Sequence, residues 1–168
     1  MVKERIYHGK PNNTLYVDSR ESRKTKEEFI KLGETEKNLV VFIVAMTTGD
    51  FRNKYAIMEA KSIDDLISSI TQKIPRKNGT IYERLDEQVA RLISDPAMYK
   101  YLLVHGNLDE CYSKIHPNAV RGQLASISAQ GINLVWQPAN FDFNDMVLRI
   151  HYKTMKYGEQ RVLNGEFQ

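Results

Sequence analysis

Short apolar runs alternate along this chain with segments whose apolar residues recur at helical spacing, and this alternation constrains the fold more than any other feature. The clearest apolar run, residues 39–46, has the length of a buried strand and is far too short to cross a membrane. A helix is predicted from Ile63 onward, because Ser62 and Asp65 form a capping-box pattern in front of an apolar stripe. A single chain of 168 residues with this alternation is expected to fold as one layered α/β domain.

The same periodicities predict the remaining elements. Further strands are expected at residues 15–17, 54–60, 101–104 and 132–136, and further helices at residues 25–32, 81–93, from Pro117 onward and at 142–157. Residues 75–79 are predicted to form a loop. Gly33, Gly131 and Gly158 are each expected to end a helix, because glycine readily adopts the left-handed conformation of a helix C-cap.

The composition excludes several classes of protein. A single cysteine, Cys111, rules out an internal disulfide and a cysteine-based zinc site. The net charge of +3 suits nucleic-acid binding and equally suits many other enzymes. Without an apolar stretch of membrane-spanning or secretory-signal type, the protein is expected to be soluble and intracellular, with no membrane partner.

Acidic residues cluster where predicted strands begin and end. Asp50 lies in a turn after residues 39–46, and Glu59 and Lys61 are two residues apart on the next strand, so their side chains share a face. Carboxylates that hold a divalent cation beside a lysine are typical of enzymes that hydrolyse phosphodiesters. An acid two residues before a lysine is also a common surface ion pair, so the pair alone leaves the interpretation open.

Several segments, taken in order, resemble the XPF family of structure-specific endonucleases. Residues 16–21, Tyr-Val-Asp-Ser-Arg-Glu, are similar to the family's V-D-S-R-E motif. Gly49-Asp50-Phe51 and residues 59–66 resemble the family's G-D…E-R-K-x3-D signature. Residues 88–92 resemble its Q-V-x-R-L helix, and residues 115–122 resemble a segment of the archaeal Hef nuclease domain. The resemblance extends over residues 15–157, about the whole predicted domain.

The resemblance implies a restriction-endonuclease-like fold, in which a mixed sheet is flanked by helices in a single domain. That domain is expected at residues 14–158, between an N-terminal extension (1–13) and a C-terminal tail (159–168). The implied activity is metal-dependent endonucleolytic cleavage of branched DNA, such as flaps and forks, in DNA repair or replication-fork processing. Mg²⁺ or Mn²⁺ is the implied cofactor. The implied assembly is a homodimer, or a heterodimer with a related subunit, that pairs through the C-terminal third of the chain.

Carried over residue by residue, the resemblance also implies a site. Asp18, Asp50 and Glu59 would hold the metal, and Lys61 would complete the catalytic set. The residues implied to bind the substrate are Arg20, Glu21, Gln88 and Arg91. Asp65 would support the site, although its capping position explains it without catalysis. Arg76 and Lys77 would either contact the DNA backbone or remain solvated.

One departure and two alternatives stay open. Ala60 occupies the position of the family's arginine, which puts DNA contacts in doubt, although residue 60 points away from Glu59 and Lys61. One alternative is a catalytically weak or inactive subunit of the same fold that binds DNA or a partner. The other is a restriction-type nuclease that cuts a fixed duplex sequence. The aromatic residues expected in the core or a dimer interface, rather than as base-stacking platforms, are Tyr99, Tyr101, Trp136 and Phe143.

Overall fold

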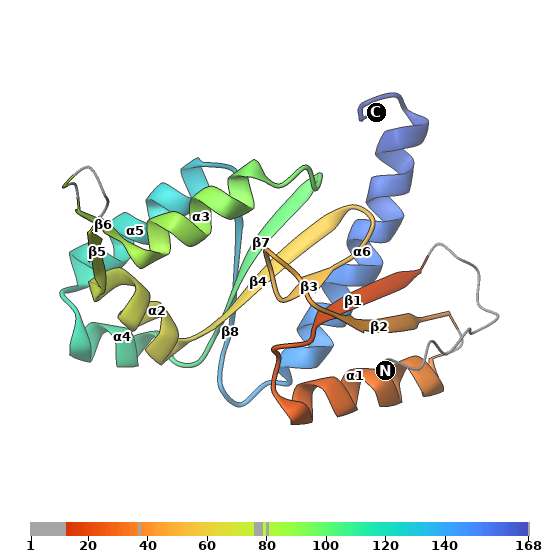
Figure 1. The fold of residues 1–168 in the computed structure, drawn as a ribbon, viewed down its shortest axis with the longest axis horizontal. Coiled ribbons are helices and arrows are strands. Elements are labelled where there is room, and N and C mark those ends of the chain that lie inside the picture. Colours follow the sequence, from red (N-terminus) through yellow and green to blue (C-terminus); the bar gives the residue numbers. More distant parts are fainter. Residues whose placement is uncertain (1–12, 37, 76–78, 80, 168) are drawn as a thin grey trace.

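A six-stranded mixed sheet forms the centre of the computed structural model, which describes residues 13–36, 38–75, 79 and 81–167 (Figure 1). In sheet order β2-β1-β3-β4-β7-β8, the strands are Val40–Val44, Thr14–Asp18, Phe51–Arg52, Ala56–Ser62, Tyr99–His105 and Asn133–Gln137. The short β3 is antiparallel to β1 and β4, and all other neighbours are parallel. The carboxyl ends of five strands therefore meet at one edge of the sheet.

Helices cover the two faces of the sheet. They are α1 (Arg23–Thr35), α2 (Ile63–Thr71), α3 (Arg84–Ser94), α4 (Leu108–Lys114), α5 (Pro117–Ala129) and α6 (Phe143–Leu163). One core cluster packs α2 to α5 against Ile57 and its neighbours, and a second packs α1 and α6 against Met58 on the opposite face. The predicted mixed sheet flanked by helices is thus confirmed. Within the described residues, no helix is long and apolar enough to cross a membrane.

The predicted loop at residues 75–79 is wrong at its edges. Lys73–Pro75 (β5) and Ile81–Glu83 (β6) pair as an antiparallel ribbon, and the following helix begins at Arg84 rather than at Ile81. Strands of three residues are too short to show a periodicity of two in the sequence. Arg76 and Lys77 lie outside the described residues.

Two of the three glycines predicted to end helices lie inside helices instead. Gly33 lies within α1, where a Cβ would stand 3.1 Å from Cγ2 of Val41, and Gly158 lies within α6 against the ring of Tyr55. Gly131 does follow α5, with a φ of 84°. A missing side chain serves close packing as well as helix termination, and sequence does not separate these two uses.

The run at residues 39–46 was predicted to form a buried strand, but β2 lies at the edge of the sheet. All five of its residues are half-buried. The short helix α4 was not predicted. Its Leu108–Lys114 segment has only seven residues, fewer than the window in which helical periodicity becomes clear.

Polar contacts fix the helices to the sheet at predicted and unpredicted places. The hydroxyl of Ser62 accepts a hydrogen bond from the Asp65 N–H at 3.1 Å and donates to the Asp65 carboxylate at 2.8 Å, which confirms Ser62 as the N-cap of α2. On the other face, the buried His151 of α6 contacts Asn53, which follows β3, through Nδ1 at 3.2 Å. Burial lowers the pKa of His151 to about 4, so the ring is neutral at pH 7.

The aromatic residues pack largely as predicted. Tyr101 and Phe143 contact the core on the α1 and α6 side, and Trp136 contacts the core on the other side. The ring of Tyr99 lies under the guanidinium of Arg161, at 5.8 Å from ring centroid to guanidinium carbon. All four rings therefore have structural contacts within the chain.

Candidate active site

Three acidic residues come together at the carboxyl edge of the sheet. Asp18 ends β1, Asp50 immediately precedes β3, and Glu59 lies in β4. The N–H of Asp18 donates to the carbonyl of Asp50 at 2.8 Å, and the N–H of Asp50 donates to the carbonyl of Met58 at 2.8 Å. The central position of β3 thus brings acids from three chain segments to adjacent strands.

Gly49 allows the turn that delivers Asp50 to this position. Its φ of 75° is in the left-handed region, and a Cβ on this residue would lie 2.7 Å from Cγ1 of Ile57. Any larger residue would therefore push the Asp50 turn away from β4.

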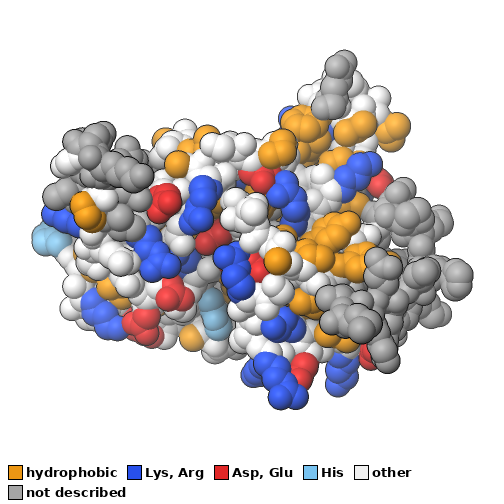
Figure 2. Space-filling model, in the orientation of Figure 1, with side chains coloured by type: hydrophobic (Ala, Val, Ile, Leu, Met, Phe, Trp, Pro, Cys, Tyr) orange, Lys and Arg blue, Asp and Glu red, His pale blue; other side chains and the backbone are white. Residues whose placement is uncertain are grey.

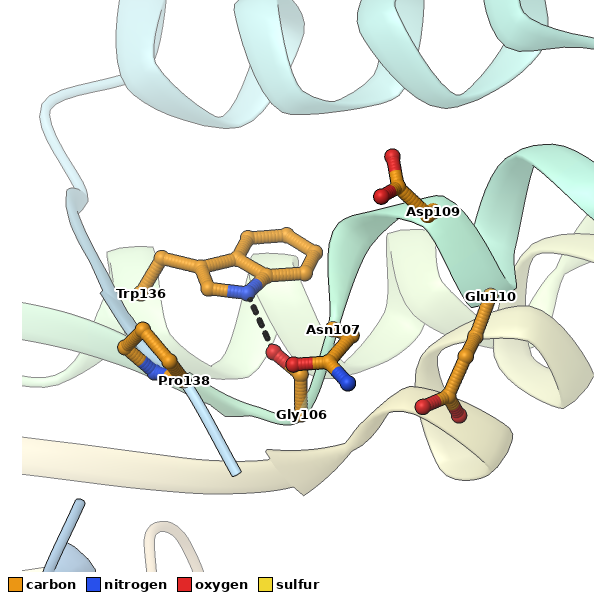
Figure 3. Close-up of a pocket in the computed structure, with 6 residues that line it drawn as sticks. All are labelled: Gly106, Asn107, Asp109, Glu110, Trp136 and Pro138. Atoms are coloured by element: carbon orange, nitrogen blue, oxygen red, sulfur yellow. Dashed lines mark hydrogen bonds between the residues drawn. The ribbon is translucent and has the colours of Figure 1, made fainter. Parts of the chain in front are cut away.

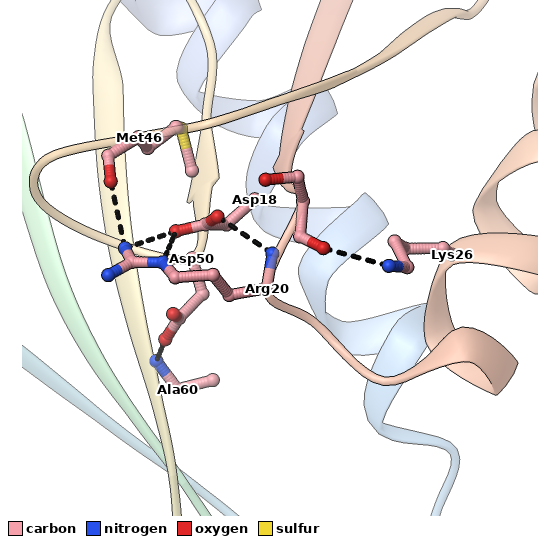
Figure 4. Close-up of polar contacts among 7 residues, drawn as sticks. Asp18, Arg20, Lys26, Met46, Asp50 and Ala60 are labelled. Carbon is pink, nitrogen blue, oxygen red and sulfur yellow. Dashed lines mark hydrogen bonds and ion pairs between the residues drawn. The ribbon is translucent and has the colours of Figure 1, made fainter.

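Arg20 engages the carboxylate of Asp18 (Figure 4). Oδ1 of Asp18 accepts from the Arg20 backbone N–H at 2.9 Å, and Oδ2 accepts from Nε at 2.9 Å and from Nη2. Nη2 also donates to the carbonyl of Met46 at 2.8 Å. Burial opposes ionisation of Asp18, but the hydrogen bonds and charge of Arg20 outweigh it and lower the pKa of this carboxyl. Asp18 is therefore an ionised, buried acid covered by an exposed guanidinium.

Asp50 faces the backbone of β4. Its Oδ2 accepts from the Ala60 N–H at 2.7 Å, as Figure 4 shows. Burial raises the pKa of Asp50, the Ala60 hydrogen bond opposes this rise, and the charge of Asp18 adds to it. A backbone group of residue 60 therefore contributes to the site even though its side chain points away.

Glu59 and Glu21 are the two acids whose protonation is most strongly perturbed. Burial followed by the charge of Asp50 raises the pKa of Glu59 to about 7. Burial followed by the charges of Asp50, Asp18 and Glu59 raises the pKa of Glu21 to about 7 as well. These effects place Glu21 in the electrostatic environment of Asp18, Asp50 and Glu59.

Lys61 is buried on the same face as Glu59, as the spacing of two residues predicted. Its side chain is only 6% exposed, and Nζ donates to the hydroxyl of Ser69 in α2 at 3.0 Å. Burial lowers the pKa of Lys61, while the nearby charges of Glu59 and Asp65 oppose this change. Ser69 lies in a segment that continues the family match, but it was not identified as a site residue, because spacing alone does not show that a side chain on the next helix contacts Lys61.

The predicted residues on α3 lie beside this cluster to different degrees. The charge of Arg91 acts on Glu59, which places its guanidinium near the acids. The side-chain oxygen of Gln88 is buried and accepts no hydrogen bond within the described part of the chain. Arg84 was not identified as a site residue, but its charge helps to lower the pKa of Lys61.

The donor set suits a divalent cation in kind. Hard cations such as Mg²⁺ prefer carboxylate oxygens. Burial first, and neighbouring negative charge second, raise the pKa values of Asp50 and Glu59, and a cation would relieve that charge. As the described side chains are placed, however, no three His, Cys, Asp or Glu residues form a group that could hold an ion. The orientations explain this, because Asp18 is turned to Arg20 and Asp50 to the Ala60 backbone.

A separate hollow of about 360 Å³ lies where β7 and β8 end (Figure 3). It is lined by Gly106, Asn107, Asp109, Glu110, Trp136 and Pro138. The carboxylates of Asp109 and Glu110 point in different directions, and the indole N–H of Trp136 already donates to the Gly106 carbonyl at 2.8 Å. None of the predicted site residues lines this hollow.

Comparison with known proteins places these features in a family. A family model described as the ERCC4 domain matches residues 17–149. No curated protein matches the chain. Among solved structures, XPF from Aeropyrum pernix in complex with DNA is similar with a TM-score of 0.62 and 22% identity, over 89% of this chain and 66% of that one. XPF from Aeropyrum pernix in a second structure gives a TM-score of 0.57 and 21% identity, over 91% and 68% of the two chains. Identities this low establish a shared fold.

Proposed function

The chain belongs to the ERCC4 domain family, as its resemblance to XPF-type nucleases predicted, and from this we propose that it is a divalent-metal-dependent DNA endonuclease. Its substrate would be branched DNA, such as a flap or fork, and its role would lie in DNA repair or replication-fork processing inside the cell. The chain spans 66% of the length of the DNA-bound archaeal protein, so the activity of a whole relative is part of this proposal.

The observation that carries the proposal is that four carboxylates lie near one another beside a buried lysine. At the carboxyl edge of the sheet, next to Lys61, the charges of Asp18, Asp50 and Glu59 help to raise the pKa of Glu21, and the charge of Asp50 helps to raise the pKa of Glu59. Such like-charge crowding is costly for a domain and typical of sites that bind a cation or transfer protons. Exposed surface ion pairs do not produce it.

The residues divide the work of hydrolysis among them. Glu59 would help to hold the cation that activates the attacking water. Lys61, fixed by its hydrogen bond to Ser69, would stabilise negative charge that develops on the phosphate. Arg20, whose side chain is 69% exposed, would contact the phosphate beside Asp18.

Mg²⁺ or Mn²⁺ is the proposed cofactor, and Asp18, Asp50 and Glu59 are the residues that would hold it. When bound, the cation would neutralise phosphate charge and lower the pKa of a water molecule. A carboxylate oxygen can accept two bonds, and Oδ1 of Asp18 accepts only the backbone N–H of Arg20. Oδ1 could therefore bind the cation while the Arg20 guanidinium stays on Oδ2.

Cleavage of end-labelled flap and fork DNA by the wild type and Asp50→Asn tests the proposal. Each protein is incubated with Mg²⁺, with Mn²⁺ or with a chelator. We expect metal-dependent cutting by the wild type and its loss in Asp50→Asn. The matched control is Asp64→Asn, which alters an exposed acid paired with Lys114 and is expected to cut normally. If the wild type cleaves no flap, fork or single-stranded DNA with either metal, the proposed nuclease activity is wrong.

Two observations favour the alternative of a catalytically weak or inactive DNA-binding or partner subunit. Both oxygens of Asp18 accept hydrogen bonds from Arg20, and Ala60 supplies only a methyl group where the resembling family has arginine. An inactive subunit would bind branched DNA in the chelator without cutting it in either metal. It would also restore or raise cutting when mixed with an active relative.

Pairing with a second subunit is part of the same proposal. The carboxyl-terminal end of α6 projects from the body of the domain (Figure 1). It carries apolar side chains that are largely exposed, Leu163 to 85% and Tyr157 to 48%. Apolar side chains grouped in this way commonly mark an interface between proteins.

A further inference from the structure

Among the described residues, no helix contributes to a core cluster on the face of β1 and β2 that is opposite α1 and α6. Leu15, Val17, Val41 and Ile43 point to the core beneath α1 and α6. The alternate residues of the same strands point to the opposite face. There, neither core cluster includes Tyr16 or Phe42, and each of these residues stays half-buried. Figure 2 shows hydrophobic side chains, with basic ones near them, on the side of the molecule that carries β1 and β2.

Tyr16 and Phe42 form a preassembled aromatic surface, here called the aromatic ledge. They are register partners on the parallel strands β1 and β2. Their rings stack with centroids 5.8 Å apart and an interplanar angle of 21°. Because the two rings are held by the sheet, an aromatic ligand placed on them would require little ordering of the protein.

The aromatic ledge adjoins the acids. Tyr16 precedes Asp18 by two residues, so their side chains share a face and their Cα atoms lie about 7 Å apart along the strand. A phosphodiester located at Asp18 therefore places a neighbouring nucleotide over or beside Tyr16. Because the ledge adjoins the candidate active site, we expect its ligand to be part of the DNA bound there.

The charges around the aromatic ledge favour a base over a phosphate. Arg52 is the register partner of Tyr16 on β3, but its guanidinium is held by both oxygens of Asp95 at 2.6 and 2.8 Å. A cation that is already paired in this way offers little to a phosphate. The outer faces of the two stacked rings instead offer a π-surface, on which any nucleobase can stack.

We propose that the aromatic ledge of Tyr16 and Phe42 stacks an unpaired nucleobase next to the scissile phosphate, and so favours DNA with a single-stranded segment at the cut. The proposal rests on the proposed nuclease function and deepens it. Bases inside a duplex are stacked on their neighbours and do not present their faces, whereas unpaired bases do. The ledge thus discriminates by strand state and not by sequence.

Binding to forked DNA with and without bases in its arms tests this inference. One fork has ordinary unpaired arms, and the other has abasic arms with the same phosphates. Dissociation constants are measured by fluorescence anisotropy in a chelator, so that metal-dependent cutting does not interfere. We expect the wild type to bind the ordinary fork about tenfold more tightly, as one stacked base provides.

Substitutions assign that preference to the aromatic ledge. Tyr16→Leu and Phe42→Leu are expected to reduce the preference to about twofold or less, because they keep apolar bulk and remove a π-face. Tyr16→Phe keeps the ring and should keep the preference. Tyr152→Leu, a matched loss of an exposed tyrosine on α6, should also keep it.

The outcomes separate this inference from the nuclease proposal. If the wild type binds the two forks equally, or if both leucine variants keep the full preference for the ordinary fork, the proposed base stacking on the ledge is wrong even if the protein cuts DNA. A tenfold preference that depends on the ledge supports it even if no cutting occurs. If a leucine variant does not fold, the fluorescence of 2-aminopurine in the wild-type complex decides. Quenching beside the junction supports stacking, and unchanged emission overturns it.

Discussion

At Glu59, burial and the charge of Asp50 act in the same direction, and the cost of that arrangement depends on pH. The carboxyl group has a pKa of about 7 in the folded domain against 4.5 in an unfolded chain. Below pH 4.5 both states are protonated and the folded state is not penalised. As the pH rises through 7, the folded state must accept a buried negative charge, and stability is lost.

Glu59→Gln should therefore stabilise the metal-free domain at pH 8 and have little effect at pH 5. The shift at Glu59 corresponds to roughly 1–3 kcal/mol between these conditions. Urea unfolding of the two proteins at both pH values measures it. Glu27→Gln, which changes an exposed acid of α1 paired with Arg23, should alter stability equally at the two pH values. An equal gain for Glu59→Gln at pH 5 and pH 8 would refute the electrostatic explanation.

Lys61 offers the complementary test of chemistry at the residue scale. Lys61→Met keeps an apolar stem of similar length beneath α2 and removes the charge beside the acids, so the fold should persist. We expect DNA cleavage to fall by about 10²- to 10³-fold, as for loss of one electrostatic contact to a transition state. Lys114→Met, at an exposed ion pair with Asp64, should cut at the wild-type rate. Wild-type cleavage by Lys61→Met would remove this lysine from the site.

At the scale of elements, close approach between α6 and the β3–β4 turn fixes the long helix on the sheet. Gly158 packs directly against the ring of Tyr55, and His151, two turns earlier, contacts Asn53. Sequence periodicity assigned Gly158 to a helix end because a glycine in mid-helix is intrinsically unfavourable. Tertiary contact outweighs that preference here, since any Cβ would occupy the space of the tyrosine ring.

Gly158→Ala should consequently destabilise the domain despite the higher helix propensity of alanine. The new Cβ would lie 2.3 Å from Cγ of Tyr55, and overpacking of this kind costs about 1–3 kcal/mol. Gly122→Ala in α5 is the matched control, because nothing lies within 4 Å of its Cβ position. That control should gain about 0.5–1 kcal/mol. Thermal unfolding of both variants decides, and a stabilised Gly158→Ala would contradict the packing described.

At the scale of the whole molecule, the projecting end of α6 is the feature that the single domain does not satisfy internally. Apolar side chains there remain exposed after folding: Tyr157, Val162, Leu163 and Phe167. By contrast, the two core clusters include most large apolar side chains of the sheet outside the aromatic ledge. An interface at this end would leave the candidate active-site edge open to DNA.

The wild type is thus predicted to be a dimer at micromolar concentration, and Leu163→Asp to shift it toward the monomer. A buried, unpaired carboxylate at an apolar interface is unfavourable, whereas the same change at a free surface is tolerated. Light scattering coupled to size exclusion measures the mass. Ile30→Asp, at an exposed position of α1, should remain dimeric. A monomeric wild type would remove self-association from the proposal.

The sequence by itself determined the order and type of most elements, the α2 cap at Ser62 and the shared face of Glu59 and Lys61. These features depend on residues within one or two turns or strand positions of each other, and such local constraints are visible as periodicity or spacing. The ordered motifs also predicted the family and proposed Asp18 and Asp50 as partners of Glu59. Their catalytic roles remain predictions.

Only the tertiary structure decided which strands are neighbours, and with that the edge position of β2, the contact of Lys61 with Ser69 and the coupling of Glu21 to the acids. It also decided that Gly33 and Gly158 serve packing rather than helix termination. Burial and the pKa shifts it causes arise from contacts between segments far apart in the chain. Those contacts form only when the strands on both sides of β3 have assembled into the sheet, so no local pattern in the sequence predicts them.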